Sequence, residues 1–116
     1  MLINIKPEIK RLLRGIPELG NRVYLAYPED GTEFPCATFY EAANSAADRR
    51  DDQEYITEIE VYVSVWGETP EQIEPIARQV EERLTAARYQ RMLCYDDYSG
   101  TAKQKIMRYR AYKAQN

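Results

Sequence analysis

The fold is decided by the stretch Glu54-Tyr55-Ile56-Thr57-Glu58-Ile59-Glu60-Val61-Tyr62-Val63-Ser64-Val65-Trp66. Its odd-numbered positions from Tyr55 to Val65 are almost wholly apolar, whereas its even-numbered positions are mixed. An alternation with a period of two predicts a long strand that is covered on one side only. The β-branched and aromatic content of the stretch also favours a strand. We therefore expect this segment to be the central strand of a sheet.

A helix that covers this strand is predicted directly after Gly67. Thr69 is placed to cap the helix, Pro70 occupies its first position, and apolar residues then recur at helical spacing as far as Ala87. Pro75 removes one amide from the hydrogen-bond ladder, so we expect the helix to be regular only after this residue.

A first amphipathic helix is predicted near the amino end. Asn4 can cap it, Gly15 and Pro17 end it, and the apolar stripe on one face has the width needed to pack on a sheet. Four further strands are expected at 22–27, 36–41, 89–95 and 102–112.

Residues 42–53 break every periodicity and predict a long, polar, mobile loop. Such a loop is a candidate contact element, and a solvated hairpin tip is the alternative. The predicted order is α-β-β-β-α-β-β, and its short links favour antiparallel neighbours. We expect a single domain over 1–116 with an α+β fold: an antiparallel sheet of about five strands, with two helices packed on one face.

Composition excludes most catalytic chemistry. The sequence contains no histidine, its five glycines are scattered at turn positions, and Cys36 and Cys94 are isolated. The clustered carboxylates, including Asp96 and Asp97, lack calcium-loop spacing and are interpreted as solvated charges. We therefore predict no enzyme activity, no catalytic residue, no cofactor and no metal site. The net charge of −3 argues against duplex binding, and no apolar run approaches bilayer length, so the chain is expected to be made in the cytoplasm.

The charge distribution suggests pairing or assembly. Glu58 and Glu60 lie on the outer face of the central strand, and Arg108 and Arg110 share one face of the last strand. If the two strands are neighbours, these residues form cross-strand pairs. If they lie on opposite flanks, they suit head-to-tail self-assembly into a ring.

The ten tyrosines exceed what so small a core can bury with satisfied hydroxyls. Tyr62 and Trp66 share the outer face of the central strand, which suggests an interface patch. Cover by the 42–53 loop is the alternative.

The sequence resembles a known family over nearly its whole length. The resemblance rests on the first helix, on 23–28, 34–41 and 63–67, on the second helix, and on the basic stretch 105–109. In this order the elements look like the small tail terminator or tail-completion proteins of long-tailed bacteriophages and prophages.

The resemblance implies a non-enzymatic virion protein. Such proteins form a ring, usually a hexamer, on the head-proximal end of the tail tube, where they stop tube growth and join the head. The implied partners are further copies of the chain, the tail tube protein and a head-completion or neck protein, with no membrane. DNA would pass through the ring without sequence-specific binding. The residues expected at subunit or partner contacts are Asp48, Arg49, Arg50, Asp51, Asp52, Glu58, Glu60, Tyr62, Trp66, Arg108 and Arg110.

Two other classes compete with this interpretation. The basic last strand, with aromatic residues between its charges from Lys103 to Tyr112, is also typical of a single-stranded nucleic-acid-binding face. A small enzyme on a ferredoxin-like sandwich is the second alternative, and the missing histidine and phosphate loop oppose it.

Overall fold

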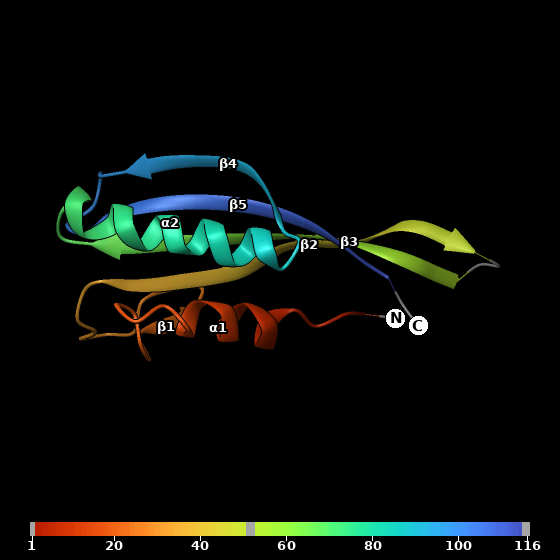
Figure 1. Ribbon diagram of the computed structural model, residues 1–116, viewed down its shortest axis with the longest axis horizontal. Coiled ribbons are helices and arrows are strands. Elements are labelled where there is room, and N and C mark those ends of the chain that lie inside the picture. Colours follow the sequence, from red (N-terminus) through yellow and green to blue (C-terminus); the bar gives the residue numbers. More distant parts are fainter. Residues whose placement is uncertain (1, 51–52, 115–116) are drawn as a thin grey trace.

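The computed structural model describes residues 2–50 and 53–114 and has an α+β fold with the predicted element order (Figure 1). The helices are α1 (Lys6–Arg14) and α2 (Pro70–Ala86). The strands of the sheet are β1 (Val23–Leu25), β2 (Cys36–Arg50), β3 (Gln53–Gly67), β4 (Gln90–Asp97) and β5 (Lys103–Ala114).

The strands form one sheet in the order β1-β2-β3-β5-β4, with β3 at its centre. Three of the four strand pairs are antiparallel, as predicted, but β1 runs parallel to β2 and places Val23 opposite Ala37. The parallel direction follows from the link 26–35. This link is a long loop rather than a tight hairpin turn, so the chain can return before it enters β2. The hydroxyls of Tyr24 and Thr32, 2.7 Å apart, hold the loop against β1.

The core lies between the sheet and the two helices. Thr57, Ile59, Val61, Val63 and Val65 of β3 are fully buried, which confirms the predicted alternation. The apolar stripes of α1 and α2 pack against this face, together with inward-facing residues of β2 and β5. Both helices therefore cover the same face of the sheet, and within the described residues no helix lies on the opposite face.

The described part of the 42–53 segment is strand rather than loop, so the loop prediction is wrong, and the strand pairing supports the hairpin alternative. β2 continues through it to Arg50 and pairs with β3 as far as the pair Arg50↔Gln53. Irregularities in register next to Ala42 and Ala47 shift the alternation, which explains why the sequence shows no strand period here. The resulting β2–β3 hairpin extends beyond the other elements and makes the molecule long and narrow, 51 × 24 × 24 Å (Figure 1).

The helix ends differ slightly from the predictions. Thr69 caps α2 by accepting a hydrogen bond from the backbone N–H of Gln72, as expected. However, α2 is helical from Pro70 onward, so the expectation that it is regular only after Pro75 is wrong. Pro75 is exposed on the outer side of the helix, where water can satisfy the carbonyl that lacks a partner. Asn4, the predicted cap of α1, lies one residue before the cap position, Ile5. Its side chain accepts a hydrogen bond from the backbone N–H of Lys6.

Candidate functional site on the uncovered face of the sheet

The uncovered face is the side of the sheet opposite the helices. Strand register places on this face the residues that alternate with the core-facing ones. Its members include Thr38 and Tyr40 of β2, Glu58, Glu60, Tyr62, Ser64 and Trp66 of β3, Gln104, Ile106, Arg108, Arg110 and Tyr112 of β5, and Leu93 and Tyr95 of β4. The even-numbered side chains of the central strand therefore lie on the outer face, as the sequence predicted.

Aromatic rings gather in the middle of the uncovered face. Tyr40 and Tyr62 are direct cross-strand partners, and their rings stack with centroids 5.2 Å apart. Tyr27 and Tyr95 lie close enough to act on Tyr40: its pKa is raised first by partial burial and then by these neighbouring hydroxyls and that of Tyr62. Four tyrosines from four different parts of the chain thus converge on one surface. We call Tyr27, Tyr40, Tyr62, Tyr95 and Trp66 the aromatic patch.

The aromatic patch surrounds a depression of about 290 Å³. The indole N–H of Trp66 donates a 2.9 Å hydrogen bond to the hydroxyl of the buried Thr38, which fixes the indole ring. Ser64 and Ile106 also line the depression. The structure thus brings Tyr62 and Trp66 into one patch. The alternative that residues 42–53 cover this patch is wrong, because the described part of that segment lies within the sheet.

The charged residues of the uncovered face form pairs across β3 and β5. The Arg108 guanidinium donates from Nη2 to both carboxylate oxygens of Glu60 at 2.7 Å, and Arg110 Nη1 lies 3.6 Å from Glu58 Oε1. Because β3 and β5 are neighbours, the cross-strand alternative is confirmed and the opposite-flank arrangement is wrong. The Arg108 guanidinium also lies over the ring of Tyr62, 5.9 Å from its centroid.

Four of the five basic residues of β5 have carboxylate partners, and the fifth, Lys103, lies near the backbone oxygen of Glu68 and the ring of Tyr98. Lys105 Nζ lies 2.9 Å from Asp96 and 3.0 Å from Glu74, and these carboxylates raise the pKa of the ammonium although burial opposes them. Lys113 Nζ lies 3.1 Å from Glu8. Single-stranded nucleic acid requires cations available to its phosphates, and these cations already have carboxylate partners. The arrangement does not support the nucleic-acid alternative.

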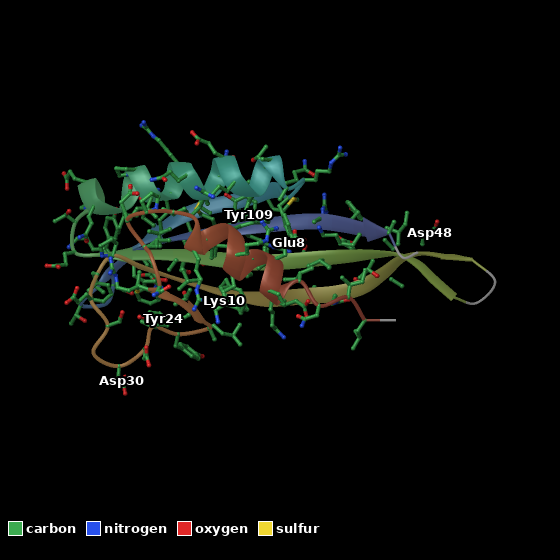
Figure 2. All side chains as sticks on the ribbon, turned by 60° about the horizontal axis from the view of Figure 1, so that its bottom comes forward. Glu8, Lys10, Tyr24, Asp30, Asp48 and Tyr109 are labelled. Carbon is green, nitrogen blue, oxygen red and sulfur yellow. The ribbon has the colours of Figure 1, made fainter. Side chains whose placement is uncertain are left out.

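The predicted residues of the hairpin lie far from the aromatic patch. Asp48 lies on the hairpin, at the opposite end of the molecule from Asp30 of the β1–β2 link (Figure 2). The backbones of Arg49 and Arg50 belong to β2, whereas Asp51 and Asp52 lie outside the described residues. The predicted contact residues therefore divide into two groups, one on the uncovered face and one on the hairpin.

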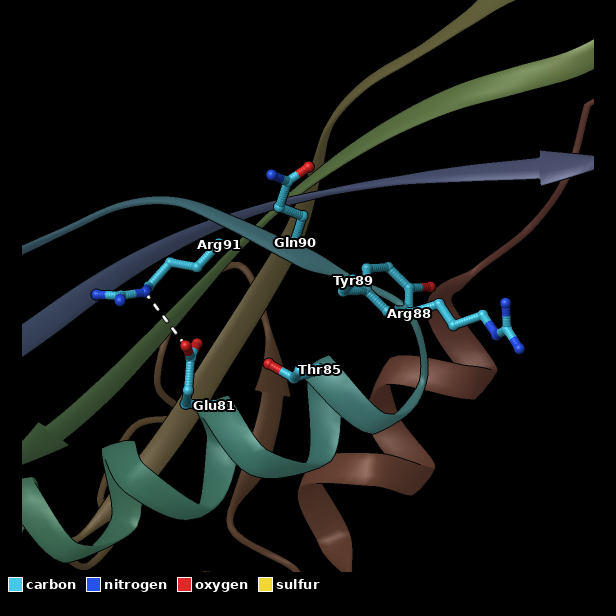
Figure 3. Close-up of a pocket in the computed structure, with 6 residues that line it drawn as sticks. All are labelled: Glu81, Thr85, Arg88, Tyr89, Gln90 and Arg91. Atoms are coloured by element: carbon cyan, nitrogen blue, oxygen red, sulfur yellow. Dashed lines mark ion pairs between the residues drawn. The ribbon is translucent and has the colours of Figure 1, made fainter.

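A second depression, of about 410 Å³, lies where α2 meets β4 (Figure 3). Its walls are partly polar and partly apolar, and they include the ion pair Arg91 Nε–Glu81 Oε2 at 3.3 Å. Glu81 also accepts a 2.7 Å hydrogen bond from the Tyr109 hydroxyl, so this carboxylate already has a hydrogen-bond partner in the core. This depression holds no nucleophile activated by a base. Among residues 2–50 and 53–114, no cluster of three metal-ligating side chains is found.

Sequence reasoning missed three members of the aromatic patch, Tyr27, Tyr40 and Tyr95. Tyr40 follows from the register alone, because it lies directly opposite Tyr62. The place of Tyr95 can be predicted only if the register irregularity next to Met92 is known, because this irregularity decides which residues of β4 face outward. Tyr27 lies in the link after β1 and reaches the patch only because β1 runs parallel to β2.

Comparison with known proteins identifies the family. Within the described part of the chain, no helix has the length and apolar character required to cross a membrane. No curated protein matches the sequence. A family model described as "Tail completion protein gp17" matches residues 6–104, which span both helices, the strands from β1 to β4 and the beginning of β5. The chain therefore belongs to the tail completion protein gp17 family of bacteriophage tail proteins.

Proposed function

We propose that this phage tail protein is a tail terminator, which forms a ring, usually of six copies, on the head-proximal end of the tail tube and joins the tube to the head. The observation that supports this most is the aromatic patch. The exposed fractions of Tyr27, Tyr40 and Tyr95 are 80%, 44% and 48%. Tyrosine and tryptophan on one surface are typical of protein contacts, because they bury a large area at a small cost in side-chain entropy.

The mechanism is capping by complementary surfaces. One side of the ring matches the contact by which tube rings stack, and the other side does not accept a further tube ring. No covalent bond forms or breaks, so the protein acts as a non-enzymatic component of the virion. Its partners are further copies of itself, the tail tube protein and a head-completion or neck protein.

The two groups of predicted contact residues have different roles in this proposal. On the uncovered face, Tyr62 and Trp66 contribute to the protein contact, while the pairs Arg108–Glu60 and Arg110–Glu58 hold β3 and β5 in register beneath it. The β2–β3 hairpin, on which Asp48 lies, projects toward the next ring or the lumen. Carboxylates there would let DNA pass without sticking.

The test is complementation in a phage whose own copy of the gene is deleted. Without the protein, we expect tails of irregular, excessive length and no joined heads. The wild-type chain should restore tail length. A variant in which Tyr27, Tyr40 and Tyr95 are replaced by alanine should fail to restore it, although its Tm should stay within a few degrees of wild type.

A matched control is Lys10→Ala with Glu82→Ala, two exposed changes on the helix side of the molecule. This control should complement fully. Normal tail length and joined heads in the deletion phage would contradict the proposed function. Full complementation by the triple tyrosine variant would instead remove the aromatic patch from the contact.

A further inference from the structure

The sheet has two edges that are free to pair. β4 forms one edge of the sheet. At the other edge, β1 pairs with β2 only from Ala37 to Phe39. Within the described residues, β2 from Tyr40 to Arg50 therefore has a strand partner on one side only, namely β3. Each free edge presents backbone N–H and C=O groups to the surroundings.

Neither edge carries lysine or proline, and the charged residues on them are Arg91, Asp96 and Asp97 of β4 and Glu41 of the β2 segment 40–47. β4 contains no lysine and no proline, and Met92, Leu93 and Tyr95 on it are 40%, 37% and 48% exposed. The β2 segment 40–47 also lacks lysine and proline and consists mostly of alanine and serine. Soluble proteins normally protect such edges with charges, proline or covering loops, because unprotected edges associate. These few charged residues and the register irregularities on both strands are the exceptions, and the irregularities interrupt the ladder only locally.

We propose that β4 of one subunit adds to β2 of a second copy, over residues 40–47, and so continues the sheet from one subunit into the next. The proposal rests on the ring of the proposed function and names the contact that builds it. The segment 40–47 begins directly where the β1 pairing ends, and the part of β2 that follows this pairing is long enough for all eight residues of β4.

Strand direction supports a second copy as the occupant. β2, β3, β5 and β4 alternate in direction, so β4 runs opposite to β2 within one subunit. Two copies placed side by side in the same orientation therefore bring β4 and β2 together as antiparallel strands and continue the alternation. The contact joins two different edges, so it is heterologous and can close into a ring.

Side-chain size also supports this occupant. The large side chains of Met92, Leu93 and Tyr95 would lie beside a segment in which residues 42, 43 and 45–47 are alanine or serine.

Disulfide trapping tests the contact. In a Cys94→Ser background, cysteine is introduced at Ala43 or Ser45 on β2 and at Leu93 or Tyr95 on β4, in all four pairwise combinations that cover the possible registers. Oxidation at rising protein concentration is followed by a non-reducing gel. At least one combination should give a ladder of covalent oligomers. Each variant with one introduced cysteine should stop at the dimer, because the remaining Cys36 is buried, and so should a mixture of two such variants.

The control combines Lys10→Cys with Glu82→Cys, two exposed positions on the helix side, and should give no ladder. All variants should keep a Tm close to that of the background. The absence of a ladder from every edge combination would overturn the edge pairing. A mass of about six subunits by light scattering, without such a ladder, would refute the edge pairing and leave the proposed function standing. A ladder from open chains that never close into rings would confirm the edge pairing and contradict the ring.

Discussion

Arg108 of β5 and Glu60 of β3 form an ion pair, in which one guanidinium nitrogen, Nη2, lies 2.7 Å from both carboxylate oxygens. The two residues are diagonal neighbours, since Arg108 lies opposite Tyr62 and Glu60 lies opposite Arg110. The pair therefore joins the central strand to its neighbour at the base of the aromatic patch. This geometry makes the pair a determinant of register, in addition to any part it takes in assembly.

The first prediction concerns this ion pair. Arg108→Glu should lower the Tm and weaken assembly, because it places two carboxylates together on adjacent strands. The double exchange Arg108→Glu with Glu60→Arg should recover most of both losses, since it restores the pair with its polarity reversed. Thermal melts and light scattering of the four proteins in this cycle check the prediction. An additive cycle with no recovery would show that the pair contributes nothing to register.

The second prediction concerns the hydrogen bond beneath the aromatic patch. Trp66→Phe should destabilise the fold by about 1–2 kcal/mol, because it leaves the buried Thr38 hydroxyl without the indole donor. Thr38→Val should destabilise the Trp66→Phe protein less than it destabilises the wild type, because in the Trp66→Phe protein it removes a hydroxyl that has already lost its hydrogen bond. Urea unfolding measures both effects. Equal costs of Thr38→Val in the two backgrounds would argue against the hydrogen bond.

The sequence predicts the fold best where one period runs without interruption. The alternation from Thr57 to Val65 predicts the central strand, and the cap at Thr69 predicts where α2 begins. The prediction fails where the period shifts. Irregularities next to Ala42 and Ala47 hide the second half of β2, because a bulge moves later side chains to the other face.

The candidate site could be predicted only in part for the same reason. Tyr62 and Trp66 follow from the alternation of the central strand, and the charged pairs follow once β3 and β5 are known to be neighbours. Which strands lie next to one another depends on the topology of the sheet, which the local sequence does not encode. Tyr27, Tyr40 and Tyr95 join the patch through the strand order and through the parallel β1, so no local pattern could assemble them.

A third prediction concerns the two thiols. Burial raises the pKa of Cys36 to about 11, against an ordinary value of 9.0, while the charge of Arg22 partly opposes this shift. At a pH near 8 the thiolate fraction of Cys36 should therefore be reduced about a hundredfold, and the fold also blocks access to it. A chromogenic disulfide reagent should titrate only Cys94 in the native protein and both thiols in guanidinium. Rapid reaction of two thiols in the native state would contradict this.

A fourth prediction concerns alkaline solution. Burial raises the pKa of Tyr109 above its ordinary value of 10.0, and its hydrogen bond to Glu81 adds to the rise. The unfolded chain therefore loses this proton at lower pH than the folded chain does. Stability should be unaffected below about pH 10 and should fall above it, by up to about 1.4 kcal/mol per pH unit for this group.

Thermal melts at pH values between about 8 and 11 measure this dependence. Tyr109→Phe should lower the stability at neutral pH, because Glu81 loses its donor, and should flatten the fall above pH 10. Tyr27→Phe, at an exposed position, is the control and should leave the alkaline slope unchanged. An unchanged slope in Tyr109→Phe would show that this hydroxyl does not govern the alkaline loss.

The ring is the central claim of the proposed function, and the mass and shape of the assembled protein test it most directly. Light scattering after size exclusion gives the mass, and negative-stain images give the shape, for the protein alone and after mixing with tail tubes of the same phage. We predict annular particles of about six times the 13.6 kDa subunit mass, free in solution or seated on one end of each tube. A single-subunit mass at every concentration, together with tube ends that gain no cap, would contradict the proposed function.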